Sequence, residues 1–217
     1  MWLPREKASV IQIQKHIISL KKIMLGVVLC GGQSSRMGSD KGLLILHDKT
    51  WTQKAIDTLS NFHIPIVISV NKNQYQDYSS IFPGDTLIAD DLSLQLHGPL
   101  YGLLSVHLKY PEEDLFILAC DMPLIDKELI KQLFSKYSTE VADDAFIYTN
   151  DGEPEPMPGI YRSKGLAHVH HLYSSDQLPR HSMKYMLEHI PTSFSPLPAG
   201  KKDCFRNFNT HAELNGL

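Results

Sequence analysis

The chain lacks several features that mark whole classes of protein. No run of about 18 apolar residues occurs, so the sequence predicts no membrane-spanning helix. Its 3 cysteines stand far apart without CxxC spacing, which argues against a disulfide scaffold and against a structural zinc site. Acidic residues number 24 and basic residues 21, so no global basic field exists to bind nucleic acid. We therefore expect reduced thiols, a cytoplasmic location, and neither nucleic acid nor membrane as a partner.

The N-terminal tract differs in composition from the rest of the 217 residues. It is basic, and Val10, Ile13, Ile17 and Leu20 recur at helical spacing. We predict a basic amphipathic extension over residues 1–23 and a single domain over residues 24–217. For the extension three interpretations stay open: a helix on a membrane surface, a helix packed on the domain, or translation from a start upstream of the natural first residue, Met24.

Apolar strand patterns alternate with helical patterns along the domain. Strands are predicted over 23–29, 64–70, 86–89, 115–119 and 145–148, and helices over 51–62, 98–108, 126–134, 166–173 and 183–190. This rhythm predicts an α/β fold, a Rossmann-like three-layer α/β/α sandwich with a mostly parallel central sheet. Ligands bind such sheets at the carboxyl ends of the strands, so functional residues should follow each strand.

A glycine-rich loop follows the first predicted strand and reads LCGGQSSRMGSDK over residues 29–41. Glycines let the backbone approach a ligand closely, and successive N–H groups in such a loop form an anion site. Arg36 and Lys41 add positive charge that suits phosphate. The loop is neither a P-loop nor a GxGxxG fingerprint. It therefore predicts a phosphate site of another kind.

This loop resembles the signature of the molybdenum cofactor guanylyltransferases, the MobA-like nucleotidyltransferases. The family's pattern has alanine where Cys30 stands, a small residue in either case. Beyond the loop the resemblance extends from about residue 24 to 214, with His211 where the family usually has proline. Its further motifs are Asn71, Gly98–Gly102, Cys120–Pro123 and Asn207–Thr210. The resemblance implies a nucleotide-diphospho-sugar transferase-like fold.

The resemblance also implies an activity and a set of site residues. The enzyme would transfer GMP from GTP to the terminal phosphate of molybdenum-molybdopterin, releasing pyrophosphate and forming molybdopterin guanine dinucleotide. A molybdoenzyme or a chaperone could then be a partner. Mg²⁺ would be the cofactor, held by Asp121. Arg36, Lys41 and Asp121 would be catalytic; the nucleotide would contact Leu29, Cys30, Gly31, Gly32, Lys41, Asn71, Asp90 and Asp121; and the pterin would contact Asn207, Asn209 and Arg162.

Most of these residues also have a purely structural interpretation. Asn71 could cap a strand, Asp121 could cap a turn, and Asn207 and Asn209 could form turns. Either Asp90 or its neighbour Asp91 could be the nucleotide ligand, with Asp90 favoured because it follows the strand directly, and both could be solvated loop residues. Arg162 could be an ordinary surface arginine in a loosely matching loop over 155–162, and Cys30 and Cys120 fit small core residues better than nucleophiles.

Three other functions compete with guanylyl transfer. A cytidylyltransferase acting on the same pterin is the nearest, because the residues give no independent physical reason to prefer guanine. A sugar-1-phosphate nucleotidyltransferase often needs a longer acceptor region than this chain has. A non-catalytic carrier of nucleotide or pterin would not need Arg36, Lys41 and Asp121 together.

Overall fold

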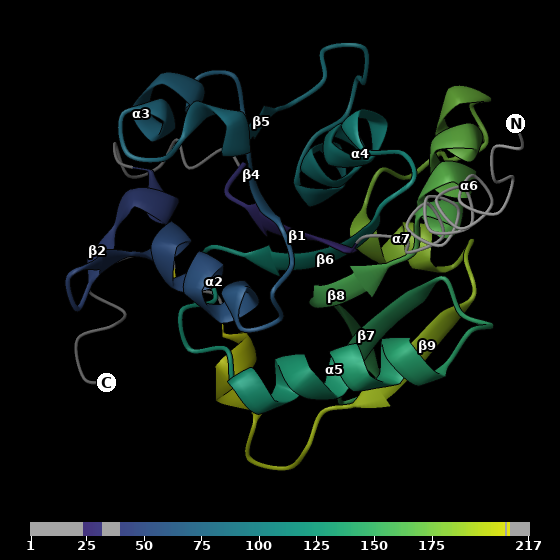
Figure 1. Cartoon of the computed structure of the whole chain (residues 1–217). Helices are drawn as coiled ribbons and strands as arrows, with labels where there is room; N and C mark the ends of the chain where they lie inside the picture. Colours follow the sequence, from purple (N-terminus) through teal and green to yellow (C-terminus); the bar gives the residue numbers. More distant parts are fainter. Residues whose placement is uncertain (1–23, 32–39, 207, 209–217) are drawn as a thin grey trace, which may run out of the picture.

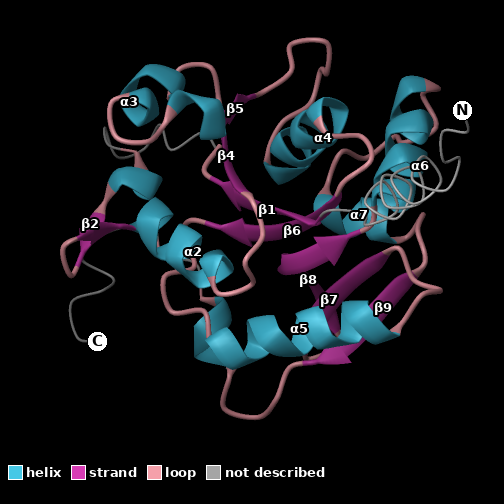
Figure 2. Cartoon of the chain, viewed as in Figure 1, coloured by secondary structure: helices cyan, strands magenta, loops and turns pink. Residues whose placement is uncertain are grey.

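A seven-stranded sheet forms the centre of the molecule (Figures 1 and 2). The computed structural model describes residues 24–31, 40–206 and 208. In spatial order the strands are β5 (Leu87–Ala89), β4 (Ile66–Val70), β1 (Met24–Leu29), β6 (Asp114–Ala119), β8 (Glu153–Tyr161), β7 (Ala145–Asn150) and β9 (Thr192–Pro196). β8 is antiparallel to both of its neighbours, and all other pairs of adjacent strands are parallel.

Helices cover both faces of this sheet, as predicted, and make the three layers visible in Figure 2. One face is covered by α4 (Pro99–Lys109), α6 (Ser163–Ser174) and α7 (Met183–Leu187). The other is covered by α2 (Trp51–Ser60) and α5 (Lys127–Thr139), with α3 (Tyr75–Ser79) beside β5. A small hairpin of β2 (Ile45–Leu46) and β3 (Lys49–Thr50) precedes α2, and 3₁₀ turns occupy Lys41–Leu43, Gly84–Thr86 and Lys202–Phe205.

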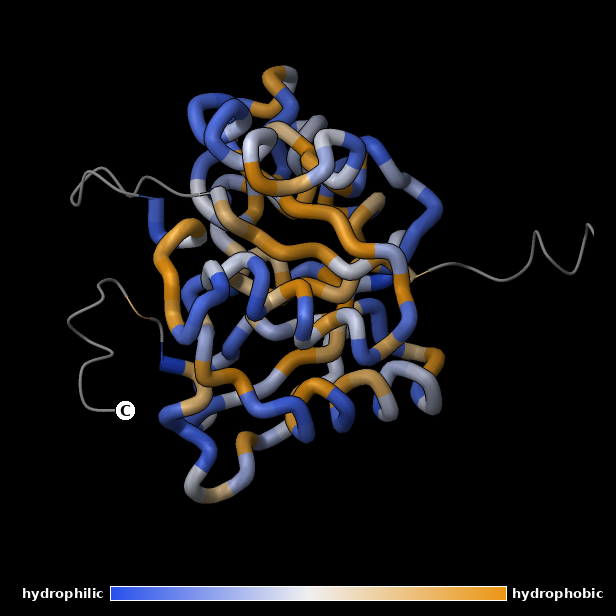
Figure 3. Tube along the Cα trace, turned by 60° about the vertical axis from the view of Figure 1, so that its left-hand side comes forward, coloured by the Kyte–Doolittle hydropathy of each residue, from blue (hydrophilic) through white to orange (hydrophobic). Residues whose placement is uncertain are grey.

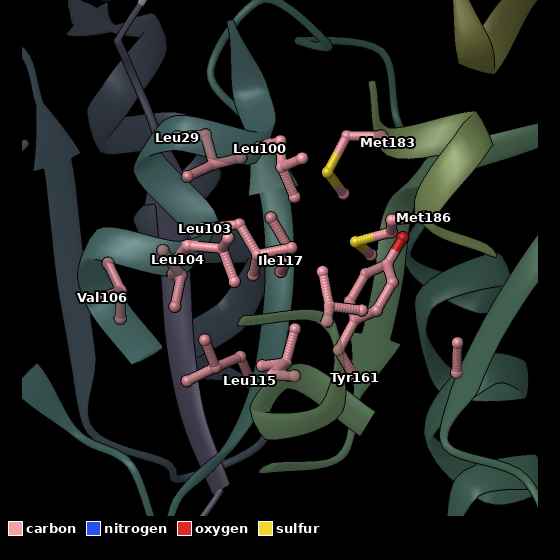
Figure 4. Close-up of a cluster of buried hydrophobic side chains, with 14 of the residues drawn as sticks. Leu29, Leu100, Leu103, Leu104, Val106, Leu115, Ile117, Tyr161, Met183 and Met186 are labelled. Carbon is pink, nitrogen blue, oxygen red and sulfur yellow. The ribbon is translucent and has the colours of Figure 1, made fainter. Parts of the chain in front are cut away.

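The strand β1 shows why the sheet divides the core into two layers. Successive side chains of a strand point to opposite faces. Leu25, Val27 and Leu29 therefore pack against α4, whereas Met24 and Val28 pack on the face covered by α2 and α5. Figure 4 shows the first of these layers, and Figure 3 shows that the apolar stretches lie mostly in the interior. A strand buried on both faces needs a continuous apolar run, which is the pattern that predicted β1.

The helix starts follow local capping chemistry. The Thr50 side chain accepts a hydrogen bond from the backbone N–H of Gln53 at the start of α2 (3.1 Å). Asp126 is the N-cap of α5 and accepts from the backbone N–H of Glu128 (2.8 Å). Among the described residues no helix is both long enough and apolar enough to cross a bilayer.

The strand β8 was not predicted, because its sequence was interpreted as an acceptor-side loop over 155–162. Pro154, Pro156 and Pro158 lack backbone N–H groups, and a proline-rich segment is typical of a loop. Pro154 lies in the part of the strand that pairs with β7, whereas Pro156 and Pro158 fall in the irregular stretch between Glu155 and Gly159, where the register of this pairing shifts. Over residues 153–155 the strand pairs with β7 alone, so it needs donors on only one side there.

The direction of β8 places Arg162 far from the predicted phosphate site. Tyr161, which ends β8, pairs with Leu115 at the beginning of β6. Asp121 follows the other end of β6, so Arg162 lies at the opposite edge of the sheet from Asp121. The arrows of β6 and β8 point in opposite directions in Figure 1. The prediction that Arg162 contacts the pterin at this site is therefore corrected, because the loop that was to carry it is an antiparallel strand.

Arg162 instead joins β8 to the elements around it. Its guanidinium donates to the backbone carbonyls of Glu140 (2.6 Å) and Asp143 (2.9 Å), and its charge centre lies 4.5 Å from the centroid of the Tyr137 ring. Its Nη1 atom is 3.8 Å from a carboxylate oxygen of the fully buried Asp114. The other partners of Asp114 include the Tyr137 hydroxyl, which donates to it at 2.8 Å.

We therefore expect Arg162→Met to destabilise the protein by about 2–4 kcal/mol, because the substitution leaves a buried carboxylate and several carbonyls without their cation. Chemical denaturation measures this free energy of unfolding. Arg180→Met is the matched control, since Arg180 is exposed and its guanidinium lies over the ring of Tyr185. Equal stability of the two variants would contradict this structural role.

Candidate functional site

Four parallel strands end at one edge of the sheet, and the predicted residues follow them there. The backbone ladder continues past the strand ends: the N–H of Cys30 donates to the carbonyl of Ser69 (2.9 Å), and the N–H of Cys120 donates to the carbonyl of Leu29 (3.1 Å). Segments distant in the sequence are thereby held side by side. The residues at this edge are Cys30 and Gly31 after β1, Asn71 after β4, Asp90 after β5 and Asp121 after β6.

A cavity of about 670 Å³ opens at this edge, between the ends of β1, β4 and β5 and the start of α4. Gly31 lines it beside Asn71 and Asp90: a Cβ atom at Gly31 would be 3.7 Å from the backbone nitrogen of Asn71 and 4.0 Å from Oδ2 of Asp90. Of the predicted nucleotide ligands, Leu29, Gly31, Asn71 and Asp90 line this cavity. Lining residues that the sequence analysis did not assign to the site include Ser69, Lys72, His97 and Tyr101.

The start of α4 forms one wall of the cavity. Gly98 has φ 71° and ψ −162°, a backbone conformation open essentially to glycine alone, and Pro99 begins the helix directly after it. One turn on, a Cβ atom at Gly102 would lie 2.6 Å from Oγ of Ser69 and 3.2 Å from Leu29. The glycine therefore lets α4 approach the ends of β1 and β4 closely, and this sets the width of the cavity.

Two buried polar atoms lie beside this cavity and have no hydrogen-bond partner within the described part of the chain. They are Oδ1 of Asp90 and Oγ of Ser69. Burial raises the pKa of Asp90 to about 6, because the ionised carboxylate loses its water there. An unsatisfied buried polar group costs free energy, so this wall of the cavity suits a ligand that donates hydrogen bonds.

The neighbouring polar residues have roles in the loops. The side-chain oxygen of Asn71 accepts from the backbone N–H groups of Asn73 (2.9 Å) and Gln74 (3.0 Å), so it caps the turn after β4. Asp91 accepts from the N–H of Ser93 (2.8 Å) and does not line the cavity. The geometry therefore favours Asp90 over Asp91 as the residue that faces a ligand.

Asp121, which follows β6 at this sheet edge, and Lys41 form the charged part of the site. Burial raises the pKa of Asp121, and the positive charge of Lys41 opposes this shift, so the two charges lie close enough to interact. The described residues contain no group of three or more His, Cys, Asp or Glu side chains that could hold a metal ion. A cation at Asp121 would therefore need oxygen ligands from a substrate and from water.

The C-terminal segment returns to this charged end of the site. The backbone N–H of Phe208 donates to the carbonyl of Asp121 (3.0 Å), and its ring is fully buried against Trp51. The predicted ligands Asn207 and Asn209 flank this anchor in sequence, and they lie outside the described residues. Gly32 and Arg36 of the glycine-rich loop likewise lie outside them.

The two cysteines at the sheet edge belong to the core. Cys30 and Cys120 are both buried and free, and the Cys30 sulfur lies 3.3 Å from Oγ1 of Thr52. Contact with the Cys30 thiol and burial raise the pKa of Cys120 well above its usual value. A thiol with a raised pKa is a poor nucleophile, so this environment supports the structural interpretation of Cys120.

Comparison with known proteins is consistent with this geometry. The model of the MobA-like NTP transferase domain matches residues 26–190. A probable molybdenum cofactor guanylyltransferase of Geobacillus sp. is 31% identical over 89% of this chain and 97% of its own length, and one of Flavobacterium johnsoniae is 29% identical over 88% and 94%. The crystal structure of molybdopterin-guanine dinucleotide biosynthesis protein A from Archaeoglobus fulgidus superposes with a TM-score of 0.70 at 22% identity, covering 88% of this chain and 95% of that one, which supports the fold. The chain belongs to the MobA-like NTP transferase family.

Proposed function

We propose that this chain transfers GMP from GTP to the terminal phosphate of molybdenum-molybdopterin, releasing pyrophosphate and forming molybdopterin guanine dinucleotide. The observation that carries the proposal is the arrangement at one sheet edge. A cavity with an unsatisfied Asp90 oxygen lies at the same sheet edge as Asp121, whose carboxylate interacts with the positive charge of Lys41. The names of the curated relatives supply the substrates, since both are described as probable molybdenum cofactor guanylyltransferases.

The cavity is the proposed site of the nucleoside. Its volume of about 670 Å³ is in the range of small-molecule sites. The ionised Asp90 carboxylate would accept hydrogen bonds from the nucleoside, and the backbone from Leu29 to Gly31 and Asn71 would line its path. Gly32 follows Gly31 in the sequence and is also a proposed ligand of the nucleotide.

Lys41, Arg36 and Asp121 are the proposed catalytic residues at the triphosphate. The Asp121 carboxylate fits Mg²⁺, because burial disfavours its lone negative charge and a hard cation prefers oxygen ligands. Such an ion would neutralise phosphate charge, and oxygens of the triphosphate and of water would supply its other ligands. The positive charge of Lys41 interacts with Asp121, which supports a role for Lys41 at the same phosphates. Lys41 and Arg36 would stabilise the negative charge that develops on the leaving pyrophosphate.

The chemistry requires positioning more than proton transfer. An oxygen of the pterin's terminal phosphate would form a bond to the α-phosphorus of GTP, while the bond from that phosphorus to the bridging oxygen breaks and pyrophosphate leaves. The attacking phosphate is already ionised, so no strong general base is needed. Asn207 and Asn209 are proposed pterin ligands, because Phe208 between them is anchored to the Asp121 backbone.

We expect Asp121→Asn to lower the rate of pyrophosphate release at least about 100-fold, because the substitution removes the proposed ligand of the metal. The assay combines molybdenum-molybdopterin with Mg²⁺ and either GTP or CTP, and circular dichroism checks that the variant folds. Asp85→Asn is the control, since Asp85 is exposed in the turn before β5. Full activity of the Asp121 variant would rule out this metal site.

The same assay separates the competing functions. Release from GTP alone supports guanylyl transfer, and faster release from CTP would assign the chain to cytidylyl transfer on the same pterin. Nucleotide binding without release of pyrophosphate would favour a carrier.

The pKa of Asp90 predicts a pH dependence of nucleotide binding. Because burial raises the pKa of Asp90 to about 6, the carboxyl group is largely ionised at pH 7.5 and largely protonated at pH 5. The carboxylate accepts hydrogen bonds more strongly than the acid, so binding should weaken as pH falls through about 6.

Calorimetric titration of wild-type protein and of Asp90→Asn with GTP and Mg²⁺ between pH 5 and pH 7.5 measures this effect. Titration of the phosphates is common to both proteins, so it cancels in the ratio of their dissociation constants. We expect the wild type to bind more tightly at pH 7.5 and this advantage to disappear near pH 5. A ratio that stays constant over the whole range would show that Asp90 does not contact the nucleotide.

A further inference from the structure

Gln74 connects three segments of the site with one buried side chain, of which 8% is exposed. Its amide nitrogen donates to the backbone carbonyl of Cys30 (3.0 Å) and to the carboxylate of Asp40. Its amide oxygen accepts from the backbone N–H of Asn71 (2.9 Å). Cys30 and Asp40 stand at the two ends of the glycine-rich loop, so Gln74 fixes both ends relative to the turn after β4.

Asp40 is the centre of this arrangement and directly precedes Lys41. Its other carboxylate oxygen accepts from the backbone N–H of Gly42 (2.8 Å) and from the hydroxyl of Tyr78 (2.9 Å). Tyr78 is fully buried, and burial raises the pKa of its hydroxyl, which keeps the group protonated as a donor. We call Asp40, Gln74 and Tyr78 the Asp40 network.

The residue after Lys41 is held as firmly as the residue before it. A Cβ atom at Gly42 would lie 2.1 Å from the Tyr78 hydroxyl oxygen and 2.7 Å from Oγ1 of Thr52, so the site has no room for a larger residue. The Thr52 hydroxyl donates to the carbonyl of Gly42 (2.8 Å). The backbone of Lys41 is thereby fixed on both sides by side chains from α2 and from the segment around α3.

We propose that Gln74 and Tyr78 are positioning residues for Lys41, acting through Asp40. The proposal deepens the proposed function, on which it rests, because Lys41 is the residue assigned there to the triphosphate. Bonds to a carboxylate are strong and directional, so the Asp40 network sets where the Lys41 backbone lies rather than only adding apolar burial. A displacement of a catalytic group by about 1 Å can lower a rate about 100-fold.

The placement of these residues in α3 supports a role of this kind. Tyr75, Gln76 and Asp77 of the same short helix are exposed, whereas Tyr78 and the preceding Gln74 are buried and both donate to Asp40. The inward polar groups of this segment are thus directed at one carboxylate of the glycine-rich loop. A helix needed only to cover the sheet would instead present apolar side chains.

The first test compares Gln74→Leu with Gln76→Leu, the same change at an exposed position two residues away. Pyrophosphate release from GTP and molybdenum-molybdopterin gives kcat and KM, and thermal melting gives stability. We expect Gln74→Leu to lower kcat/KM about 10- to 100-fold and Gln76→Leu to change it less than twofold. Equal activity of the two variants, with wild-type protein active, contradicts the proposal.

A second test restores the network by exchanging its partners, and it applies even where Gln74→Leu does not fold. Gln74→Glu places two carboxylates together, so we expect a loss of activity at least as large as that of Gln74→Leu. Adding Asp40→Asn gives a carboxylate and an amide again, with their positions exchanged. The pairing with residue 40 returns, whereas the hydrogen bond to the Cys30 carbonyl does not, so we expect the double variant to be at least about threefold more active than Gln74→Glu alone. An activity no higher than that of Gln74→Glu alone would contradict the pairing.

A third test distinguishes positioning from simple stabilisation. In a Lys41→Ala background the network no longer has a lysine to position, so Gln74→Leu should lower the remaining activity less than about twofold. A full second loss in that background would overturn the proposal.

Wild-type protein that releases no pyrophosphate contradicts the proposed function instead. The stability effects of Asp40→Asn and Gln74→Leu then test the contact itself, since additive changes in melting temperature would disprove it.

Discussion

The site depends on one constraint, the parallel alignment of β5, β4, β1 and β6. Parallel neighbours finish at the same edge of a sheet, and the chain must return through a crossover before each new strand. The segments containing α2, α3 and α4 provide these returns. Gly31, Asn71, Asp90 and Asp121 therefore meet at one edge although they are far apart in the sequence. The apolar packing of both sheet faces holds the strands in this register and so holds the polar residues in place.

The same alignment concentrates unfavourable charge. Burial raises the pKa of both Asp90 and Asp121, so their ionised forms are costly in the protein by itself. The positive charge of Lys41 offsets part of this cost at Asp121. A nucleoside that donates hydrogen bonds to Asp90, and a cation at Asp121, would relieve what remains. The net charge of −3 therefore says little about the partner, because the charges that bind it are local.

The sequence was informative where one local pattern determines the structure. The strands β1 and β6 are buried on both faces, so their continuous apolar runs identified them, and the residues after them identified the site edge. Contacts between distant segments left no such pattern. Gln74 reaches Cys30 and Asp40 across the fold, and Ser69 lies within an apolar strand, so neither was assigned to the site. Placing Arg162 required the direction of β8, and the three prolines of that segment indicated a loop instead of a strand.

Under the proposed function, the reversal at β8 would also separate the two substrates. The cavity lies on the side of β4, β5 and α4, so in the proposed function a nucleoside bound there would direct its phosphates toward Lys41 and toward Asp121 at the end of β6. Beyond β6 the next strand runs the other way and offers no carboxyl end at this edge. That space is approached instead by the C-terminal segment, where Phe208 binds the Asp121 backbone and packs against Trp51. In-line attack requires the acceptor to enter opposite the leaving pyrophosphate, so under the proposed function the acceptor would approach from the side of Asp121 nearest Phe208.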